Sequence, residues 1–213
     1  MRKTINCFIP YEENTAIDKV VTALKDSIVV NKIYLLTTAH GSMPSVPAGC
    51  EPLTIDSLNS SDTIKKIAQK ADTPFTLLYT KASPFELGYM ALERIADFLQ
   101  DRKTGMVYAD HYEWKEEEKK KHPAIDYQPG SVRDDFDFGA LLAFRSEYLI
   151  GAAGMMENER EDYRYAGLYA TRLFIAETSR IVHINEYLYT EIEEDNRLSG
   201  DRKSTRLNSS HSH

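Results

Sequence analysis

Short apolar runs alternate with amphipathic segments along the first half of the chain. Five apolar runs have the length of buried strands, and they span residues 4–9, 32–37, 50–55, 75–79 and 105–110. After the first run, residues 16–24 place apolar side chains at the spacing of one helical face. The same spacing predicts a helix after the N-cap residues at 57–62 and a longer helix that starts at Ser83 and Pro84.

The second half of the chain has a different pattern. Residues 112–128 have the pattern of a hairpin whose tip is the charge run at 116–121. We expect a strand over 138–144, a largely helical segment over 158–177 and a last strand over 181–184. This half therefore adds antiparallel structure to a chain that otherwise alternates strand and helix.

The alternation of strands and helices predicts the fold class. It favours an α/β protein with a mostly parallel sheet, helices on both faces and a small antiparallel extension. We find no internal repeat and no interior linker, so residues 1–200 are expected to form one domain. Residues 201–213 are polar and basic and resemble the translation of a common sequencing-library adapter. We expect a non-native tail there, or a natural disordered one, and a non-native tail would make the chain a fragment.

Composition narrows the function classes. The net charge of −7 argues against a nucleic-acid partner, because no basic stripe is available to neutralise phosphates. The apolar runs are too short for a transmembrane segment or a signal peptide, and the two cysteines do not make a disulfide framework. Dinucleotide and P-loop signatures are absent, as are the HExxH, CxxC and GxSxG motifs. Because we find neither a signal peptide nor a disulfide framework, we expect a cytoplasmic protein.

Polar residues follow the carboxyl ends of two expected strands, where open α/β sheets bind their ligands. After the first strand, Pro10 directs the chain out of the sheet, and Tyr11, which precedes Glu12, can stack on a base. Asp56 ends the third strand and can accept a hydrogen bond from a base or a ribose hydroxyl. The structural alternatives are an ordinary strand-ending turn and plain helix capping.

Carboxylates near the hairpin are candidate metal ligands. Asp110 ends the fifth strand, where a carboxylate can hold a divalent cation that bridges a diphosphate. Strand alternation points Asp110 and His111 to opposite sides, so we do not expect them to share a cation. Asp135 and Asp137 bracket one residue and can face one way in extended chain. The structural alternative to a metal site is that these acids are ordinary polar residues at the start of the hairpin and at the start of the next strand.

Two further groups of titratable residues carry weaker signals. The histidines are scattered, and although His111 and His122 flank the hairpin, no paired metal-ligand spacing stands out. The acidic cluster at 157–162 opens an expected helix, where acids suit the helix dipole. Its functional alternative is a general base for an acceptor hydroxyl.

Several segments together resemble the GT-A domain of family-two bacterial glycosyltransferases. They are TINCFIPY, FTLLYTKASPFELG, GMVYADHYE, DFDFGALLAFR and RIVHINEYLYTEIEEDNRLSG. The likeness covers essentially residues 1–200 and is greatest to the N-terminal domain of tandem two-domain members. It implies a GT-A-like fold, a nucleotide-sugar donor such as a UDP-sugar, a glycan or lipid-linked acceptor, and a divalent Mn²⁺ or Mg²⁺ ion. It also implies work on cell-surface polysaccharide, in the cytoplasm or at the inner face of the membrane, and a second transferase domain after Gly200.

The resemblance also assigns roles to donor-site residues. Pro10 and Tyr11 match the family's Pro-Tyr near the nucleobase, and Asp56 falls at its acid for uracil or ribose. The family's metal-binding Asp-x-Asp falls on Thr80-Lys81-Ala82, which contains no acid. Lys81 is expected to neutralise phosphate there as a point charge, with Asp110 or Asp137 as alternative acids for a metal.

The general base of the family is less clearly matched. It is a Glu-Asp pair before a Leu-Arg-Leu-like helix, and the acids nearest to Arg172-Leu173 are Glu161 and Asp162. An active but atypical transferase is therefore one hypothesis. The other is a degenerate GT-A module that binds a glycan, a partner domain or a nucleotide without chemistry. A nucleotidyltransferase normally has a Gly-rich phosphate loop after the first strand, and residues 11–15 lack one.

Overall fold

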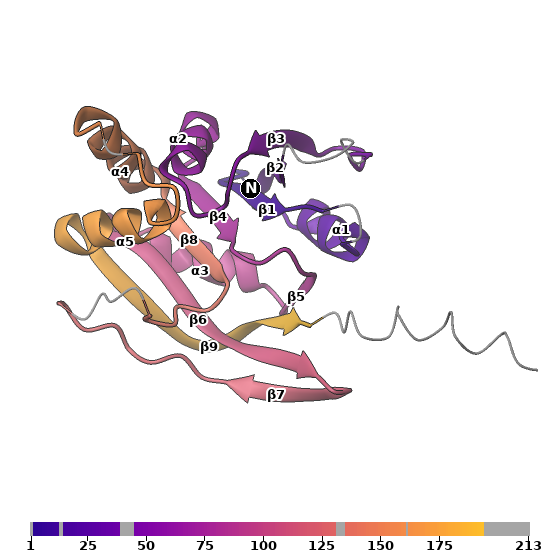
Figure 1. The fold of residues 1–213 in the computed structure, drawn as a ribbon. Coiled ribbons are helices and arrows are strands. Elements are labelled where there is room, and N and C mark those ends of the chain that lie inside the picture. Colours follow the sequence, from indigo (N-terminus) through magenta and orange to yellow (C-terminus); the bar gives the residue numbers. More distant parts are fainter. Residues whose placement is uncertain (1, 13–14, 39–44, 131–134, 161, 194–213) are drawn as a thin grey trace, which may run out of the picture.

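The computed structural model of the protein describes residues 2–12, 15–38, 45–130, 135–160 and 162–193. Within them the chain forms one nine-stranded sheet with helices on both of its faces (Figure 1). The strands are β1 Ile5–Pro10, β2 Val30–Thr38, β3 Glu51–Ile55, β4 Phe75–Tyr79, β5 Phe85–Leu87, β6 Thr104–Lys115, β7 Glu118–His122, β8 Leu141–Arg145 and β9 Arg180–Ile192. The helices are α1 Asp18–Asp26, α2 Ser61–Lys70, α3 Ala91–Leu99, α4 Ser146–Asn158 and α5 Gly167–Thr178. Among the described residues, no helix has both the length and the apolarity needed to cross a membrane.

Strands β1 to β4 are parallel, and the order in which strands are added to the sheet reverses at β1. Strand β1 pairs with β2 on one side and with β4 on the other, and β3 adds to the far side of β2. The chain thus leaves β1 for β2 and β3, then returns on the opposite side of β1 as β4. The carboxyl ends of β1 and β4 therefore flank a topological switch point, which is where open α/β sheets bind ligands.

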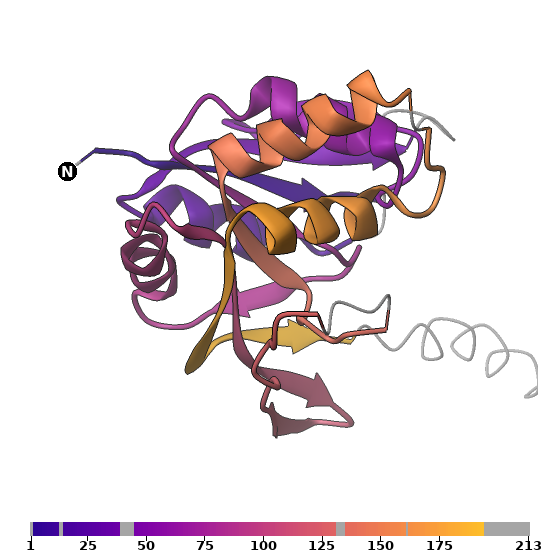
Figure 2. The ribbon, with the colours of Figure 1, turned by 90° about the vertical axis from the view of Figure 1, so that its left-hand side faces the viewer.

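The other half of the sheet is mixed and is organised by the long strand β6. Strand β8 lies antiparallel between β4 and β6, and β9 pairs in parallel with β6 along most of its length. Strand β7 forms an antiparallel hairpin with β6 that extends away from α4 and α5 (Figure 2). The predicted fold class is confirmed: an α/β fold with a largely parallel sheet, helices on both faces and antiparallel strands at one side.

Two hydrophobic clusters, one on each face, hold the helices to the sheet. Helices α1 and α3 pack in one cluster, for example through Leu24 and Leu99. Helices α2, α4 and α5 pack in the other, for example through Ile67. Successive residues of a strand point to opposite faces, so Leu77 and Leu78 of β4 enter different clusters. A strand that is buried on both faces in this way has the nearly continuous apolar sequence noted above.

Two predicted helices differ from the structure. The helix expected from Ser83 and Pro84 is replaced there by β5, because this segment pairs with β9, and α3 begins only at Ala91. The helix expected over 158–177 is wrong in its first half, since α4 ends at Asn158 and α5 starts at Gly167. Local apolar spacing did not reveal these breaks, which tertiary pairing and helix packing impose.

Strand limits in the second half also differ from prediction. The hairpin is present, but β7 begins at Glu118, so its tip is only Glu116 and Glu117, both with positive φ. Such a two-residue turn with left-handed residues matches the twist of paired strands. Strand β8 starts at Leu141, later than expected, and β9 extends to Ile192 because it follows β6.

We expect Gly167→Ala to destabilise the protein, because a methyl group there would meet the main chain at the start of α2. A Cβ on Gly167 would lie 2.5 Å from the Ser60 carbonyl carbon and closer still to the Ser61 nitrogen. Overpacking of this kind should lower the free energy of unfolding by about 1–3 kcal/mol, measured by urea denaturation. The matched control is Gly154→Ala in α4, where nothing lies within 4 Å and a gain of up to about 1 kcal/mol is expected. Equal effects of the two substitutions would contradict this account.

Candidate functional site

The carboxyl ends of β1 and β4 bring Pro10, Tyr11 and Lys81 to one edge of the sheet. Pro10 is the last residue of β1, and the half-buried Tyr11 follows it. The Tyr11 hydroxyl donates to the main-chain carbonyl of Ser45 over 3.1 Å. Lys81 lies just beyond β4 and forms an ion pair with the carboxylate of Glu191 on β9. The lysine is therefore already partnered in this structure.

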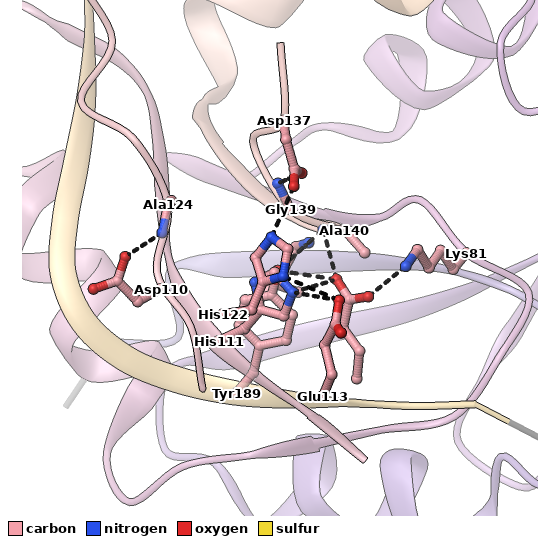
Figure 3. A network of polar contacts seen from close by, with 12 residues as sticks. Lys81, Asp110, His111, Glu113, His122, Ala124, Asp137, Gly139, Ala140 and Tyr189 are labelled. Atoms are coloured by element: carbon pink, nitrogen blue, oxygen red, sulfur yellow. Dashed lines mark hydrogen bonds and ion pairs between the residues drawn. The ribbon is translucent and has the colours of Figure 1, made fainter. Parts of the chain in front are cut away.

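Beside Lys81 lies a group of side chains that we call the polar cluster. It consists of Lys81, His111, Glu113, His122, Asp137 and Glu191 (Figure 3). His111 of β6 lies opposite His122 of β7 in the sheet register. Two residues further along β6, Glu113 lies opposite Glu191 of β9. Because residues i and i+2 of a strand share a face, three neighbouring strands present these side chains to the same side.

The carboxylate of Glu191 is the most buried acid of the polar cluster. Its side chain is 6% exposed, and Oε1 accepts hydrogen bonds from the Ala140 N–H over 3.1 Å and the Tyr189 hydroxyl over 3.4 Å. Its Oε2 faces the Lys81 ammonium. A buried charge needs such partners, so Glu191 ties β9 to β4 and to the start of β8.

A second chain of contacts joins Glu113, His122 and Asp137. Nδ1 of His122 lies 3.2 Å from Glu113 Oε1, and its Nε2 lies 2.9 Å from Asp137 Oδ2. The other Asp137 oxygen accepts the Gly139 N–H over 2.8 Å. Burial raises the pKa of Asp137, but the Gly139 N–H and His122 outweigh it, so the pKa lies below its usual range. The pKa of Glu113 is also lowered, because contacts with Lys115 outweigh burial. Both carboxylates are therefore ionised at neutral pH.

His111 lies between these two chains and is almost fully buried. Its ring stacks between those of His122 and Tyr189, with centroid separations of 4.5 and 5.0 Å. Nε2 lies 3.4 Å from Glu191 Oε1 and 3.9 Å from Glu113 Oε1, while Nδ1 has no hydrogen-bond partner among the described residues. Burial lowers the pKa of His111 more than the neighbouring Glu191 raises it. The imidazole is therefore neutral at neutral pH.

A small cavity opens onto the polar cluster at the end of β4. Its volume is about 130 Å³, and its walls include Thr80, Lys81, Gly139 and the acids Glu113, Asp137 and Glu191. One ammonium thus faces three carboxylates. A cavity with this excess of negative charge attracts cations.

Asp110 belongs to a different network, on the opposite face of β6. Its carboxylate accepts the Ala124 N–H over 2.7 Å and lies 2.7 Å from Nε2 of His183. Nδ1 of His183 lies 2.5 Å from Asp126. As strand alternation predicts, Asp110 and His111 point to opposite sides, and Figure 3 shows Asp110 apart from the polar cluster. The proposed metal ligands Asp110 and Asp137 are thus held by separate sets of partners.

The remaining predicted site residues lie along the same sheet edge or outside the described chain. Asp56 accepts hydrogen bonds from the Ser57 N–H over 2.7 Å and the Ser60 hydroxyl over 2.6 Å, and these bonds lower its pKa. The side chain of Glu12 is exposed. Asp162 is exposed near the start of α2, with Oδ1 3.4 Å from the Ser61 hydroxyl. Glu161 lies outside the described residues.

Of the polar cluster, the sequence predicted Lys81 and Asp137 as site residues, but not His111, Glu113, His122 or Glu191, although one signal was available. The two-residue tip at Glu116 and Glu117 sets the register that pairs His111 with His122. The predicted tip spans residues 116–121, and a tip of that length does not give this register. Glu191 had no local signal, because only the parallel pairing of β9 with β6 brings it next to Glu113.

The residues at the end of β4 do not fit an oxygen-ligated Mg²⁺ or Mn²⁺ site of the kind that the resemblance implies. Thr80-Lys81-Ala82 supplies no carboxylate, and the Lys81 ammonium occupies the position next to Glu191. Among the described residues, one group of three or more potential ligands has its ligand atoms within 4.8 Å of one another, namely His111, Glu113 and His122. This set is rich in nitrogen, whereas Mg²⁺ prefers oxygen ligands.

No family model matches the chain, and no curated protein matches it. Among solved structures, the 2-C-methyl-D-erythritol 4-phosphate cytidylyltransferase from Thermus thermophilus is similar, with 11% identity, a TM-score of 0.50 and coverage of 86% of this chain and 89% of that one. The 4-diphosphocytidyl-2C-methyl-D-erythritol synthase from Anaerococcus prevotii has 9% identity, a TM-score of 0.50 and coverage of 85% and 87%.

A glucosyl-3-phosphoglycerate synthase is also similar in structure. The enzyme from Mycobacterium tuberculosis, in complex with Mn²⁺, UDP-glucose and phosphoglyceric acid, has 10% identity and a TM-score of 0.48, and covers 93% of this chain and 75% of that one. At these identities the likeness concerns the fold alone. The chain has the α/β fold of the two proteins with a TM-score of 0.50.

The contacts of His183 predict how stability depends on pH. Burial lowers its pKa, but hydrogen bonds with Asp126 and Asp110 raise it more, so the folded-state pKa lies above the unfolded value of about 6.5. The stabilisation is therefore complete below pH ~6.5 and is lost as pH rises through the folded-state pKa. Urea denaturation should show a free energy of unfolding that falls as pH rises above ~6.5.

The variant His183→Gln is the control for this pH dependence. It should be less stable than the parent by about 1.5–3 kcal/mol at pH ~6, since it loses hydrogen bonds to charged groups. The difference between parent and variant should narrow as pH rises above ~6.5. A difference that stays constant over this range would contradict the assignment.

Proposed function

We propose that this protein binds a nucleotide-sugar donor and transfers the sugar to a glycan or lipid-linked acceptor, as a family-two bacterial glycosyltransferase of the GT-A type. The observation that carries the proposal is the topological switch point between β1 and β4. Ligands of open α/β sheets bind in this crevice. Tyr11 directly follows β1, and Lys81 lies two residues after the end of β4.

In this proposal the donor lies along the edge with its base near β1 and its diphosphate near β4. Tyr11, with Pro10 and Glu12, forms the wall for the nucleobase, and Asp56 lies further along the edge toward the ribose. The Lys81 ammonium turns from Glu191 to the diphosphate, as its half-exposed side chain allows. Its charge stabilises the negative charge that develops on the leaving diphosphate as the bond to the sugar breaks.

The acceptor hydroxyl needs a base, and we assign this role to the acidic pair Glu161 and Asp162. The base takes the proton of the acceptor hydroxyl while the oxygen of that hydroxyl bonds to the anomeric carbon of the sugar. Asp162 supports the assignment because it is exposed and lies near the start of α2, which follows the carboxyl end of β3. This is the same edge of the sheet as the proposed donor crevice.

The extent of the domain belongs to the proposal. We assign residues 1–200 to one GT-A domain and 201–213 to a non-native or disordered tail. A second transferase domain in the same polypeptide, the cytoplasm or inner membrane face as location, and cell-surface polysaccharide as product follow from the family resemblance.

A degenerate GT-A module that serves as a binding domain is the second candidate. The observation in its favour is the polar cluster, where Glu191 neutralises Lys81 and two further carboxylates face the cavity. In a degenerate module this charge arrangement stabilises the fold and repels the diphosphate. Nucleotide binding distinguishes the two candidates.

We expect UDP and UDP-glucose to bind in calorimetric titrations, and Lys81→Ala to weaken this binding roughly 10- to 100-fold. The factor corresponds to the loss of about 1.5–3 kcal/mol from a charged hydrogen bond to phosphate. The matched control is Lys120→Ala on β7, whose ammonium lies 3.6 Å from Glu118. Titrations with and without Mn²⁺ show whether a metal contributes.

Three results of these titrations would contradict the donor site. Absence of binding at millimolar UDP would favour the degenerate module. Equal affinity of the parent and Lys81→Ala would remove the lysine from the site. Binding of CTP but not of UDP, in a parallel titration with CTP, would instead point to a nucleotidyltransferase.

Asp162→Asn should lower sugar-transfer turnover without changing donor affinity. Loss of a general base typically costs about 10²- to 10⁴-fold in rate, and an amide keeps the shape of the side chain. The readout is release of UDP from the donor with an acceptor present, together with calorimetric UDP affinity. Asp62→Asn, at the first turn of α2, is the matched control. Unchanged turnover in Asp162→Asn would exclude this residue as the base.

A further inference from the structure

We propose that His111, Glu113 and His122 bind one divalent transition-metal ion of the Zn²⁺ type, without any nucleotide. The three side chains come from one face of the β6–β7 hairpin, where two are two residues apart and the third lies directly across. The inference does not rest on the proposed transferase function, because it concerns only the affinity of this site for a metal.

The distances between the ligand atoms suit a single ion. Zn²⁺ binds nitrogen and oxygen at about 2.0–2.2 Å, so tetrahedral ligand atoms lie about 3.4 Å apart. Glu113 Oε1 lies 3.2 Å from His122 Nδ1 and 3.9 Å from His111 Nε2. Small rotations of the side chains would bring all three atoms to one ion.

The surroundings of His122 are those of a metal ligand. Its Nδ1 faces the proposed ion, while Nε2 meets the carboxylate of Asp137, which the Gly139 N–H holds in place. Metal-bound histidines commonly donate their second N–H to a carboxylate, which fixes the ring and raises its basicity. The structure thus contains the outer partner of the site as well as the ligands.

The burial of His111 is an independent observation. Its ring is 3% exposed, its Nδ1 has no hydrogen-bond partner among the described residues, and its Nε2 faces the carboxylates of Glu113 and Glu191. Those two acids lie opposite each other on neighbouring strands, an arrangement that like charges disfavour. A divalent ion bound to Nε2 of His111 would balance the negative charge of these two carboxylates.

The site would leave coordination positions open. Three protein ligands plus an open position characterise catalytic rather than structural zinc sites. Here the open side faces the cavity of about 130 Å³ that Lys81 also lines. Two imidazoles and a carboxylate select Zn²⁺, Co²⁺ or similar ions over Mg²⁺ and Ca²⁺.

The test is metal titration of the full chain without nucleotide. A background with His40→Gln, His211→Gln and His213→Gln leaves His111, His122 and His183 as the histidines. We expect one equivalent of Zn²⁺ by calorimetry, one equivalent of Co²⁺ with a visible absorption band, and a higher Tm with Zn²⁺. Millimolar Mg²⁺ should not displace either ion.

Variants identify the ligands. His122→Gln and Glu113→Gln should each weaken Zn²⁺ binding by roughly 100-fold or more, since even the loss of an outer partner costs about 10- to 100-fold. The matched controls are His183→Gln, on the opposite face of β6, and Glu118→Gln, on the exposed strand β7; both should keep the parent affinity.

Two outcomes would overturn the inference. One is the absence of Zn²⁺ heat and of a Co²⁺ band at about 100 µM metal with folded protein, which would leave the polar cluster as an ion network only. The other is unchanged affinity in both His122→Gln and Glu113→Gln. Circular dichroism of each variant separates loss of a ligand from loss of the fold.

Discussion

The pairing of strand β6 is the constraint on which the rest of the structure depends. Buried main-chain N–H and C=O groups need partners, and β6 finds them on β8, on β9 and, past the body of the domain, on β7. Through β8 it connects to the parallel strands β4 and β1. The two halves of the chain therefore form one sheet, and the switch point of the first half lies beside the polar cluster of the second.

The alternation of side chains along β6 separates two kinds of chemistry. On one face, Asp110 bonds His183 and Ala124 and so holds the segment after β7 against the sheet. On the other face, His111 and Glu113 meet the cavity at the end of β4. A shift of register by one residue would exchange these faces, which is why the hairpin tip matters for function.

Charge is what distinguishes this site from one built for an oxygen-ligated metal. Lys81 supplies a fixed cation at the end of β4, but Glu191 already compensates it, and Glu113 and Asp137 add negative charge. Beside the cavity, the group of His111, Glu113 and His122 could hold a further cation. The likeness of fold to the similar solved structures does not determine this balance, because a fold hosts many chemistries and the side chains at the site decide between them.

The sequence by itself determined the fold class and the candidate ligand-binding residues that follow the first strands. Apolar runs and helical spacing are local properties, so β1, β4 and the position of Lys81 could be predicted from them. The prediction of a helix at Ser83 and Pro84 was wrong, because β5 pairs with a strand about a hundred residues away. The pairing of His111 with His122 follows from a two-residue hairpin tip, which is a local feature. Only the tertiary structure brought Glu191 next to them, since the parallel pairing of β9 with β6 across a long separation leaves no local signal in the sequence.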